Sequence, residues 1–136
     1  MTDDGGKAER QSEEGEKMSA EPQDLRERTR KFALRIIRLY VALPKTTEAQ
    51  VIGKQMLRSG TSVGAHSREA HRGKSDPDFI TKMEGGLQEL DETAYWLELL
   101  EEAGIVAPKR LKPLRDETNE LIAIFVTIVK KMKSKR

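Results

Sequence analysis

Large apolar residues in this chain recur every three or four positions, in four segments separated by proline or glycine. Because an α-helix makes one turn in 3.6 residues, this spacing places the apolar side chains of each segment on one helix face. The four segments span 24–43, 46–75, 76–104 and 108–136. The breaks between them fall at Pro44, Gly73, Gly104 and Pro108. The sequence therefore predicts four amphipathic helices.

Short connections make consecutive helices antiparallel neighbours, so we expect an all-α fold, an antiparallel up-down four-helix bundle. The segment 121–129 has the β-branched content of a buried strand, but it continues the helical spacing of Leu111 and Leu114, which favours a helix. Two helix starts are predicted from capping residues. Thr47 would cap the second helix, with Gln50 completing a capping box, and Asp76 would cap the third, ahead of Pro77.

Residues 1–23 differ in composition from the rest of the chain. They carry 3 basic and 7 acidic residues, several glycines and almost no large apolar side chain. Such a segment cannot bury enough surface to offset the entropy lost on ordering. We therefore predict a disordered acidic N-terminal tail over 1–23 and one four-helix bundle domain over 24–136.

The sequence lacks the residues and motifs that most common catalytic sites require. There is no cysteine, and neither His66 nor His71 follows a glutamate by the three positions that a ferritin-type di-iron site needs. The segment 60–64 lacks the Gly-Lys-Ser/Thr ending of a phosphate loop, and no Gly-x-Ser-x-Gly elbow occurs. We expect no enzymatic activity, no metal and no cofactor, and we interpret His66 as a core or interface histidine.

No apolar run is long enough to cross a membrane, and the first residues lack the apolar stretch of a secretory signal. The expectation is a cytoplasmic protein without a membrane partner.

Several small or apolar residues lie outside the stripes assigned to the core. Gly53, Gly60 and Gly64 share one face of the second helix, where another backbone could approach closely. Either these residues thicken the core of a monomer or they form a subunit interface. The candidate interface residues are Gly60, Gly64, Phe79, Trp96, Ile122, Val126 and Val129.

Charge is distributed unevenly among the predicted helices. The third carries 1 basic and 9 acidic residues, whereas the other three are net positive. The acidic helix can pair within the bundle, dock on a neighbouring copy or remain solvated.

Clusters of basic residues are typical of phosphate binding, and the first helix, the end of the second and the C-terminus each have one. The candidate nucleic-acid-binding residues are Arg28, Arg35, Arg38, Arg68, Arg72, Lys74, Lys130, Lys131 and Lys133. Most of the six aromatic residues are needed for packing, so contacts with bases would be few. The alternative is that the lysines only keep an apolar fourth helix in solution.

The central part of the chain resembles a known bacterial family. The matching stretches are Gln-Met-Leu-Arg-Ser-Gly-Thr-Ser-Val-Gly-Ala at 55–65, Arg-Gly-Lys-Ser at 72–75, Asp-Phe-Ile at 78–80 and Leu-Gln-Glu-Leu-Asp-Glu-Thr-Ala-Tyr-Trp-Leu at 87–97. They are similar to the four-helix bundle proteins encoded by intervening sequences of 23S ribosomal RNA genes. The residues on motif positions are Arg58, Ser59, Ser62, Glu69, Ser75, Phe79, Glu92 and Trp96. The chain departs at 66–70, where His-Ser-Arg-Glu-Ala replaces the family's usual Asn-Ile-Ala-Glu-Gly.

The resemblance implies a homopentameric ring without enzymatic activity. It also implies kinship with accessory proteins of diversity-generating retroelements, which associate with a reverse transcriptase and with nucleic acid. Two functions follow as expectations. One is a non-catalytic ring that binds the backbone of RNA or DNA or serves as an adaptor for a nucleic-acid enzyme. The other is a structural, protein-interaction oligomer that binds no nucleic acid.

Overall fold

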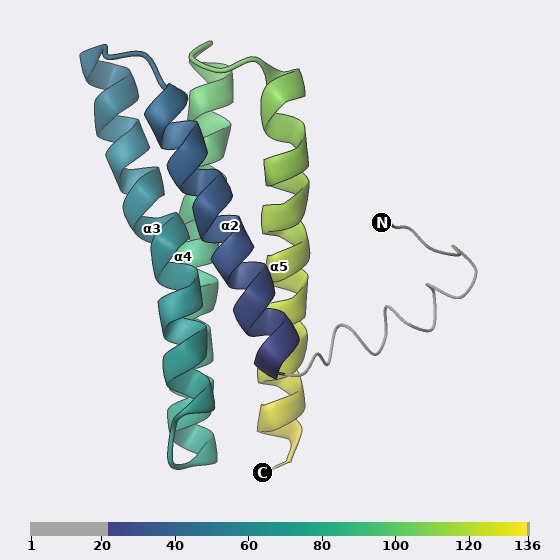
Figure 1. Ribbon diagram of the computed structural model, residues 1–136. Coiled ribbons are helices and arrows are strands. Elements are labelled where there is room, and N and C mark those ends of the chain that lie inside the picture. The colour runs from purple at the N-terminus through teal and green to yellow at the C-terminus, as the bar shows by residue number, and fades with distance from the viewer. Residues whose placement is uncertain (1–21, 136) are drawn as a thin grey trace.

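The computed structural model describes residues 22–135, so the predicted acidic tail lies outside the described residues except for Pro22 and Gln23. Four helices make up this part of the chain, with no strand among residues 22–135. They are α2 (Pro22–Ala42), α3 (Thr47–His71), α4 (Asp76–Glu102) and α5 (Pro108–Ser134). Consecutive helices run in opposite directions (Figure 1). The all-α four-helix prediction is confirmed, including the helical state of 121–129.

The N-terminal caps of α3 and α4 each lie one residue before the predicted position. The side chain of Thr46, not Thr47, accepts a hydrogen bond from the Ala49 backbone N–H at 3.4 Å. Ser75, not Asp76, caps α4 by accepting from the Asp78 backbone N–H at 3.2 Å. In both places two capping residue types are adjacent, so composition alone does not distinguish them.

Gln50 makes no capping box, because its side chain joins α3 to the end of α2. Its side-chain oxygen accepts from the Tyr40 hydroxyl, and its amide donates to the carbonyl of Pro44, both at 2.9 Å. This pair of bonds holds the connection between α2 and α3 against the start of α3.

The core contains apolar side chains from all four helices. Its largest fully buried members are Leu25, Phe32 and Ile36 of α2, Met56 and Val63 of α3, Met83, Leu90, Leu97 and Leu100 of α4, and Leu111, Leu121 and Phe125 of α5. Val129 also belongs to it, with 6% of its surface exposed, and its assignment to a subunit interface stays a prediction. At Val129, the second apolar stripe of the fourth helix therefore adds to the core of the chain.

The glycine face of α3 serves packing inside the chain. A Cβ atom on Gly60 would lie 2.8 Å from Cγ1 of the buried Ile36, and one on Gly64 would lie 3.1 Å from Oγ1 of Thr29. A close backbone approach was expected here, but the approaching helix is α2 of the same chain. The close approach thus occurs within one chain, and the assignment of Gly60 and Gly64 to a subunit interface stays a prediction.

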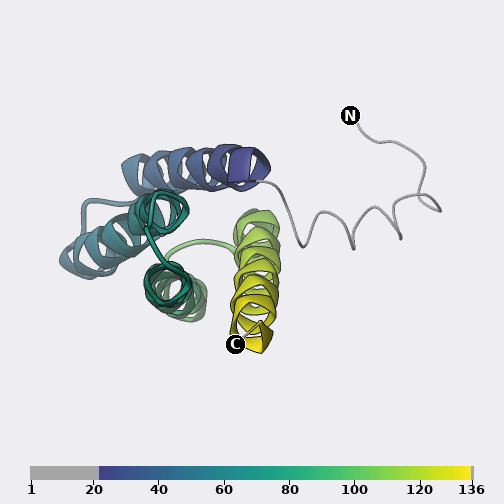
Figure 2. The ribbon, with the colours of Figure 1, turned by 90° about the horizontal axis from the view of Figure 1, so that it is seen from below.

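Helix α3 packs between α2 and α4, and α5 packs on α4. Figure 2 shows that α2 and α5 tilt in different directions. The side of the bundle between α2 and α5 is therefore less closely packed than the other three sides. None of the helices in the described part of the chain is apolar over enough of its length to span a membrane.

Replacing Gly60 with leucine is expected to lower the free energy of unfolding by about 3 kcal/mol, because the new side chain overpacks against Ile36. Urea unfolding followed by circular dichroism measures the change. Ala65→Leu, five residues along the same helix at an exposed position, is the matched control and is expected to change it by less than about 0.5 kcal/mol. Equal stability of the two variants would contradict the close α2–α3 contact.

Candidate nucleic-acid interface

A groove between α2 and α3 contains three arginines. This α2/α3 groove has a volume of about 430 Å³ and is lined by Thr29, Arg30, Ala33, Thr61, Gly64, Ala65, Arg68, Glu69 and Arg72. Its floor consists of small residues, because α2 lies close to α3 over Gly64. Small side chains on the floor and long basic ones at the rim leave room for an extended anionic chain.

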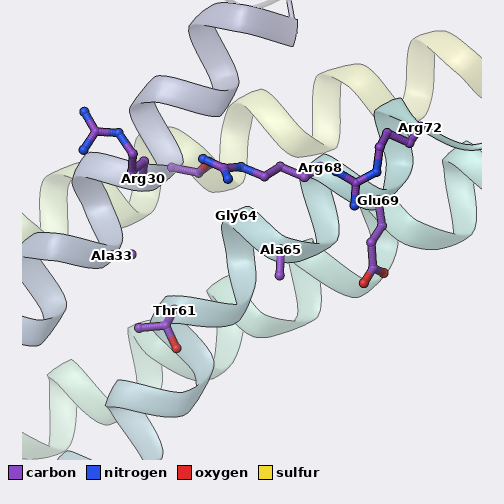
Figure 3. Close-up of a pocket in the computed structure, with 9 residues that line it drawn as sticks. Arg30, Ala33, Thr61, Gly64, Ala65, Arg68, Glu69 and Arg72 are labelled. Carbon is purple, nitrogen blue, oxygen red and sulfur yellow. The ribbon is translucent and has the colours of Figure 1, made fainter.

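Arg68 lies in the last turn of α3 and Arg72 directly follows the helix as its C-cap residue. Figure 3 shows the Arg68 side chain extending along the groove toward α2. Neither pairs with a carboxylate among residues 22–135. Arg30 points away from Arg68 and donates to Glu27. Arg30, followed by Lys31 and Arg68, holds the pKa of Glu27 below its ordinary value. Arg68 and Arg72 are therefore the groove arginines without a carboxylate partner in the described part of the chain.

A second groove lies between α2 and α5. This α2/α5 groove, of about 210 Å³, is lined by Arg35, Arg38, Leu39, Arg110, Leu111 and Leu114. Its three arginines have no ion pair within the described residues, and no carboxylate lines the groove. Three like charges at one small groove favour a bound anion.

The basic C-terminal part of α5 and the end of α3 lie at the same end of the bundle (Figure 1). Arg72 and Lys74 are at the α3–α4 connection, and Lys130 and Lys131 are exposed on the last turns of α5. Lys133 differs from its neighbours, because its Nζ atom lies 2.8 Å from a carboxylate oxygen of Glu84.

Arg28 is also engaged inside the chain. Its guanidinium donates to both carboxylate oxygens of Glu117, at 2.8 and 2.9 Å, and to Glu120. These bonds connect α2 to α5 and raise the pKa of Arg28 above its ordinary value. Of the nine candidate nucleic-acid residues, Arg28 and Lys133 thus already have carboxylate partners, and Arg28 is half-buried.

Four of the apolar candidates for a subunit interface are partly exposed. Phe79, Trp96 and Ile122 pack against the core with one side, and Val126 is also half-buried. More exposed apolar residues occur on two other faces. Ile37 and Val41 are exposed by 40% and 67% on α2, whereas Val51 of α3 and Tyr95 of α4 are exposed by 58% and 52%.

The residues that carry the family resemblance join α3 to α4. Ser59 and Thr93 share a buried hydrogen bond of 2.7 Å, and Arg58 pairs with Glu92 at 3.2 Å and with Glu89 at 3.9 Å. We call these contacts the α3/α4 seam. The remaining motif residues make other contacts within α3 and α4 or between them. Ser62 donates to the Arg58 carbonyl, Glu69 pairs with Lys82, Ser75 caps α4, and Phe79 stacks edge-on with His71.

The chain matches a known family over most of its length. Residues 21–127 match the model of the 23S rRNA-intervening sequence protein family. The chain belongs to this family. It is also similar to the crystal structure of a protein of unknown function from the S23 ribosomal protein family of Bacteroides thetaiotaomicron VPI-5482. The two are 36% identical with a TM-score of 0.75, over 80% of this chain and 97% of that one. A comparison with curated proteins gave no match.

His66 occupies the position where this 23S rRNA-intervening sequence protein departs from the usual asparagine. Its Nε2 atom lies 3.7 Å from a carboxylate oxygen of Glu89, and its ring lies against Gly85, where a Cβ atom would be 2.8 Å from Nδ1. His71 is bonded through Nδ1 to the Ser67 carbonyl at 2.9 Å. Both histidines thus contribute to packing between α3 and α4.

Several acidic residues of helix α4 form ion pairs with basic residues of the neighbouring helices. Glu89 and Glu92 pair with Arg58 of α3, and Glu84 and Glu101 pair with Lys133 and Arg115 of α5. Pairing within the bundle, one of the three alternatives, therefore accounts for these four carboxylates.

Two groove residues, Arg30 and Arg110, were absent from the sequence-based set. Arg110 joins Arg35 and Arg38 because the C-terminal half of α2 lies beside the start of α5. The antiparallel order of the helices predicts that the end of α2 lies near the start of α5. It does not predict which faces of the two helices meet, so it could not identify Arg110. In residues 22–135, no three histidine or acidic side chains come together as a metal ion would require.

The Arg28–Glu117 pair is expected to contribute about 1 kcal/mol of coupling energy, because both side chains are largely covered and the contact is bidentate. A double-mutant cycle with Arg28→Ala and Glu117→Ala, followed by urea unfolding, measures it. Arg68→Ala and Arg72→Ala, at groove positions without such partners, serve as controls and are expected to leave stability nearly unchanged. A coupling energy near zero would show that Arg28 is available for ligands instead.

Proposed function

We propose that this protein is a non-catalytic, ring-forming member of its family that binds the phosphate backbone of RNA or DNA. The observation that carries the proposal is the set of surface arginines that have no carboxylate partner within residues 22–135: Arg68 and Arg72 in the α2/α3 groove, and Arg35, Arg38 and Arg110 in the α2/α5 groove. An adaptor role beside a reverse transcriptase or another nucleic-acid enzyme is compatible with the same surface.

Contacts of this kind are weak one by one. Arginine recognises phosphate through paired N–H donors, and each neutralised phosphate releases a counterion. In a ring, the same groove is repeated on every subunit, so a long nucleic acid would engage several grooves at a high effective concentration. The proposed ring has five subunits, as the family resemblance implies.

Exposed apolar residues support assembly independently of nucleic acid. A ring needs two different complementary surfaces on each subunit. Ile37 and Val41 supply an apolar surface on α2, and Val51 and Tyr95 supply another on α3 and α4. Because α2 and α4 pack on different sides of α3, these two surfaces lie on different faces. The second candidate function, a structural oligomer without nucleic-acid binding, rests on this observation alone.

Nucleic-acid affinity is expected to fall log-linearly with salt concentration, and Arg68→Glu with Arg72→Glu should lower the slope by about 1.4 per engaged subunit. Fluorescence anisotropy of a labelled single-stranded RNA between about 50 and 200 mM salt measures it. The matched control is Lys109→Glu with Lys112→Glu, which changes the net charge equally at exposed positions of α5. No binding by the wild-type protein at the lowest salt would favour the structural oligomer. An equal decrease of the slope in the control variant would show that the α2/α3 groove is not the specific binding site.

The mass in solution is expected to be about five times the 15.4 kDa of one chain. Val51→Glu with Tyr95→Glu should dissociate the ring while leaving the helix content unchanged, since both side chains are exposed within the chain. Light scattering and circular dichroism measure the two quantities. Lys54→Glu, at an exposed position of α3, is the control and should leave the mass unchanged. A monomeric wild-type protein at micromolar concentration would contradict the assembly.

A further inference from the structure

The α2/α5 groove differs from the α2/α3 groove in the chemistry of its lining. Its six lining residues are three arginines and three leucines, whereas the α2/α3 groove also contains two threonines and a glutamate. The three leucines, Leu39, Leu111 and Leu114, are buried in the core. The wall of the α2/α5 groove therefore combines positive charge with apolar surface, and it presents no side-chain hydrogen-bond acceptor.

The three arginines of this groove come from two helices. Arg35 and Arg38 are three residues apart on α2, so they leave the same face of the helix, and Arg110 belongs to the first turn of α5. None of them forms an ion pair among residues 22–135. The first turn of α5 has no acidic residue that would offset their charge. A bound anion would relieve the repulsion among all three side chains at once.

The size of the groove limits what the anion can be. Its volume is about 210 Å³, below the roughly 300–1,000 Å³ of sites that hold drug-sized ligands. Apolar walls beside charges of one sign concentrate the electric field within such a space. The groove therefore suits a single compact group of high negative charge.

A phosphate at the end of a nucleic-acid strand has these properties, and one inside the strand does not. A phosphodiester carries one negative charge and has two free oxygens. A terminal phosphomonoester carries about −1.5 to −2 charges at pH 7 and has three strong acceptor oxygens. Arginine binds such oxygens through paired N–H donors, so three guanidinium groups match the monoester in both charge and number of acceptors.

The α2/α3 groove is less suitable for a doubly charged group. Glu69 lines it, and Arg30 is already bonded to Glu27, which leaves Arg68 and Arg72 as the arginines without a carboxylate partner in the described part of the chain. A carboxylate repels a monoester more strongly than a diester, because the monoester carries more charge. The larger α2/α3 groove therefore suits the interior of a strand, and the smaller α2/α5 groove suits its end.

We propose that the α2/α5 groove binds the terminal phosphomonoester of an RNA or DNA strand through Arg35, Arg38 and Arg110. A free nucleotide carries the same group, so the experiments below separate the two sources. The strand as ligand rests on the proposed nucleic-acid function, whereas recognition of the monoester does not.

The first experiment uses the full-length chain and two single-stranded RNAs of one sequence, labelled at the 3′ end and bearing either a phosphate or a hydroxyl at the 5′ end. Fluorescence anisotropy is expected to show about tenfold tighter binding of the 5′-phosphate RNA. A 5′-hydroxyl RNA that is two nucleotides longer adds the same charge as diesters, and its affinity is expected to rise less than about twofold. An equal rise for the longer RNA would overturn the proposal, because total charge would then explain the preference.

Two variants locate this preference. Arg38→Gln with Arg110→Gln, at two exposed positions of the groove, is expected to abolish it while circular dichroism shows unchanged helix content. The matched control is Lys109→Gln with Lys112→Gln, which removes the same charge from exposed positions at the start of α5. This control is expected to weaken both RNAs alike and to retain the preference. A preference that persists in the arginine variant, or disappears equally in the lysine variant, would overturn the assignment to the groove.

The second experiment tests the groove without a strand. Titration with adenosine 5′-monophosphate is expected to shift the side-chain Nε–H NMR signals of Arg35, Arg38 and Arg110, whereas adenosine should leave them unchanged. Shifts in a protein that binds no RNA would support recognition of the monoester while the proposed function fails. Shifts in a protein that binds both RNAs equally would assign the groove to free nucleotides and overturn the strand end as ligand. RNA binding with neither shifts nor a preference would overturn the inference while the proposed function stands.

Discussion

The close approach of α2 to α3 determines where the arginines of both helices lie. The side chain of Ile36 occupies the space beside Gly60 where a Cβ atom would otherwise lie, and Gly64 lies against Thr29. Without a Cβ atom at these positions the two helices come near enough for Arg30 of α2 and Arg68 of α3 to line one groove. A glycine in a helix interior costs about 1 kcal/mol relative to alanine, so this geometry is maintained against helix propensity. The compensation comes from burial of α2 against α3, including Phe32 and Ile36.

The basic residues of this protein lie in two different environments. Arg28 is half-buried, with paired bonds to Glu117 and a further one to Glu120, so a phosphate would have to displace carboxylates already in place. Arg68 and Arg72 lie at the rim of a groove with no such partner within the described residues. Counting basic residues cannot make this distinction, because it depends on whether the facing helix supplies a carboxylate. That fact depends on tertiary packing, which the sequence encodes only indirectly.

The sequence predicts the local structure well, because helix formation and burial follow a short-range period. The apolar stripes identify the four helices and most of the core, and Pro44, Gly104 and Pro108 mark their ends. The caps are off by one residue where Thr46 and Thr47, or Ser75 and Asp76, compete for the same role. Errors are larger where a residue's role depends on which helix faces it. Arg110 was left out of the groove that it lines, and the sequence did not show that Ile36 covers Gly60 or that Val129 lies in the core of its own chain.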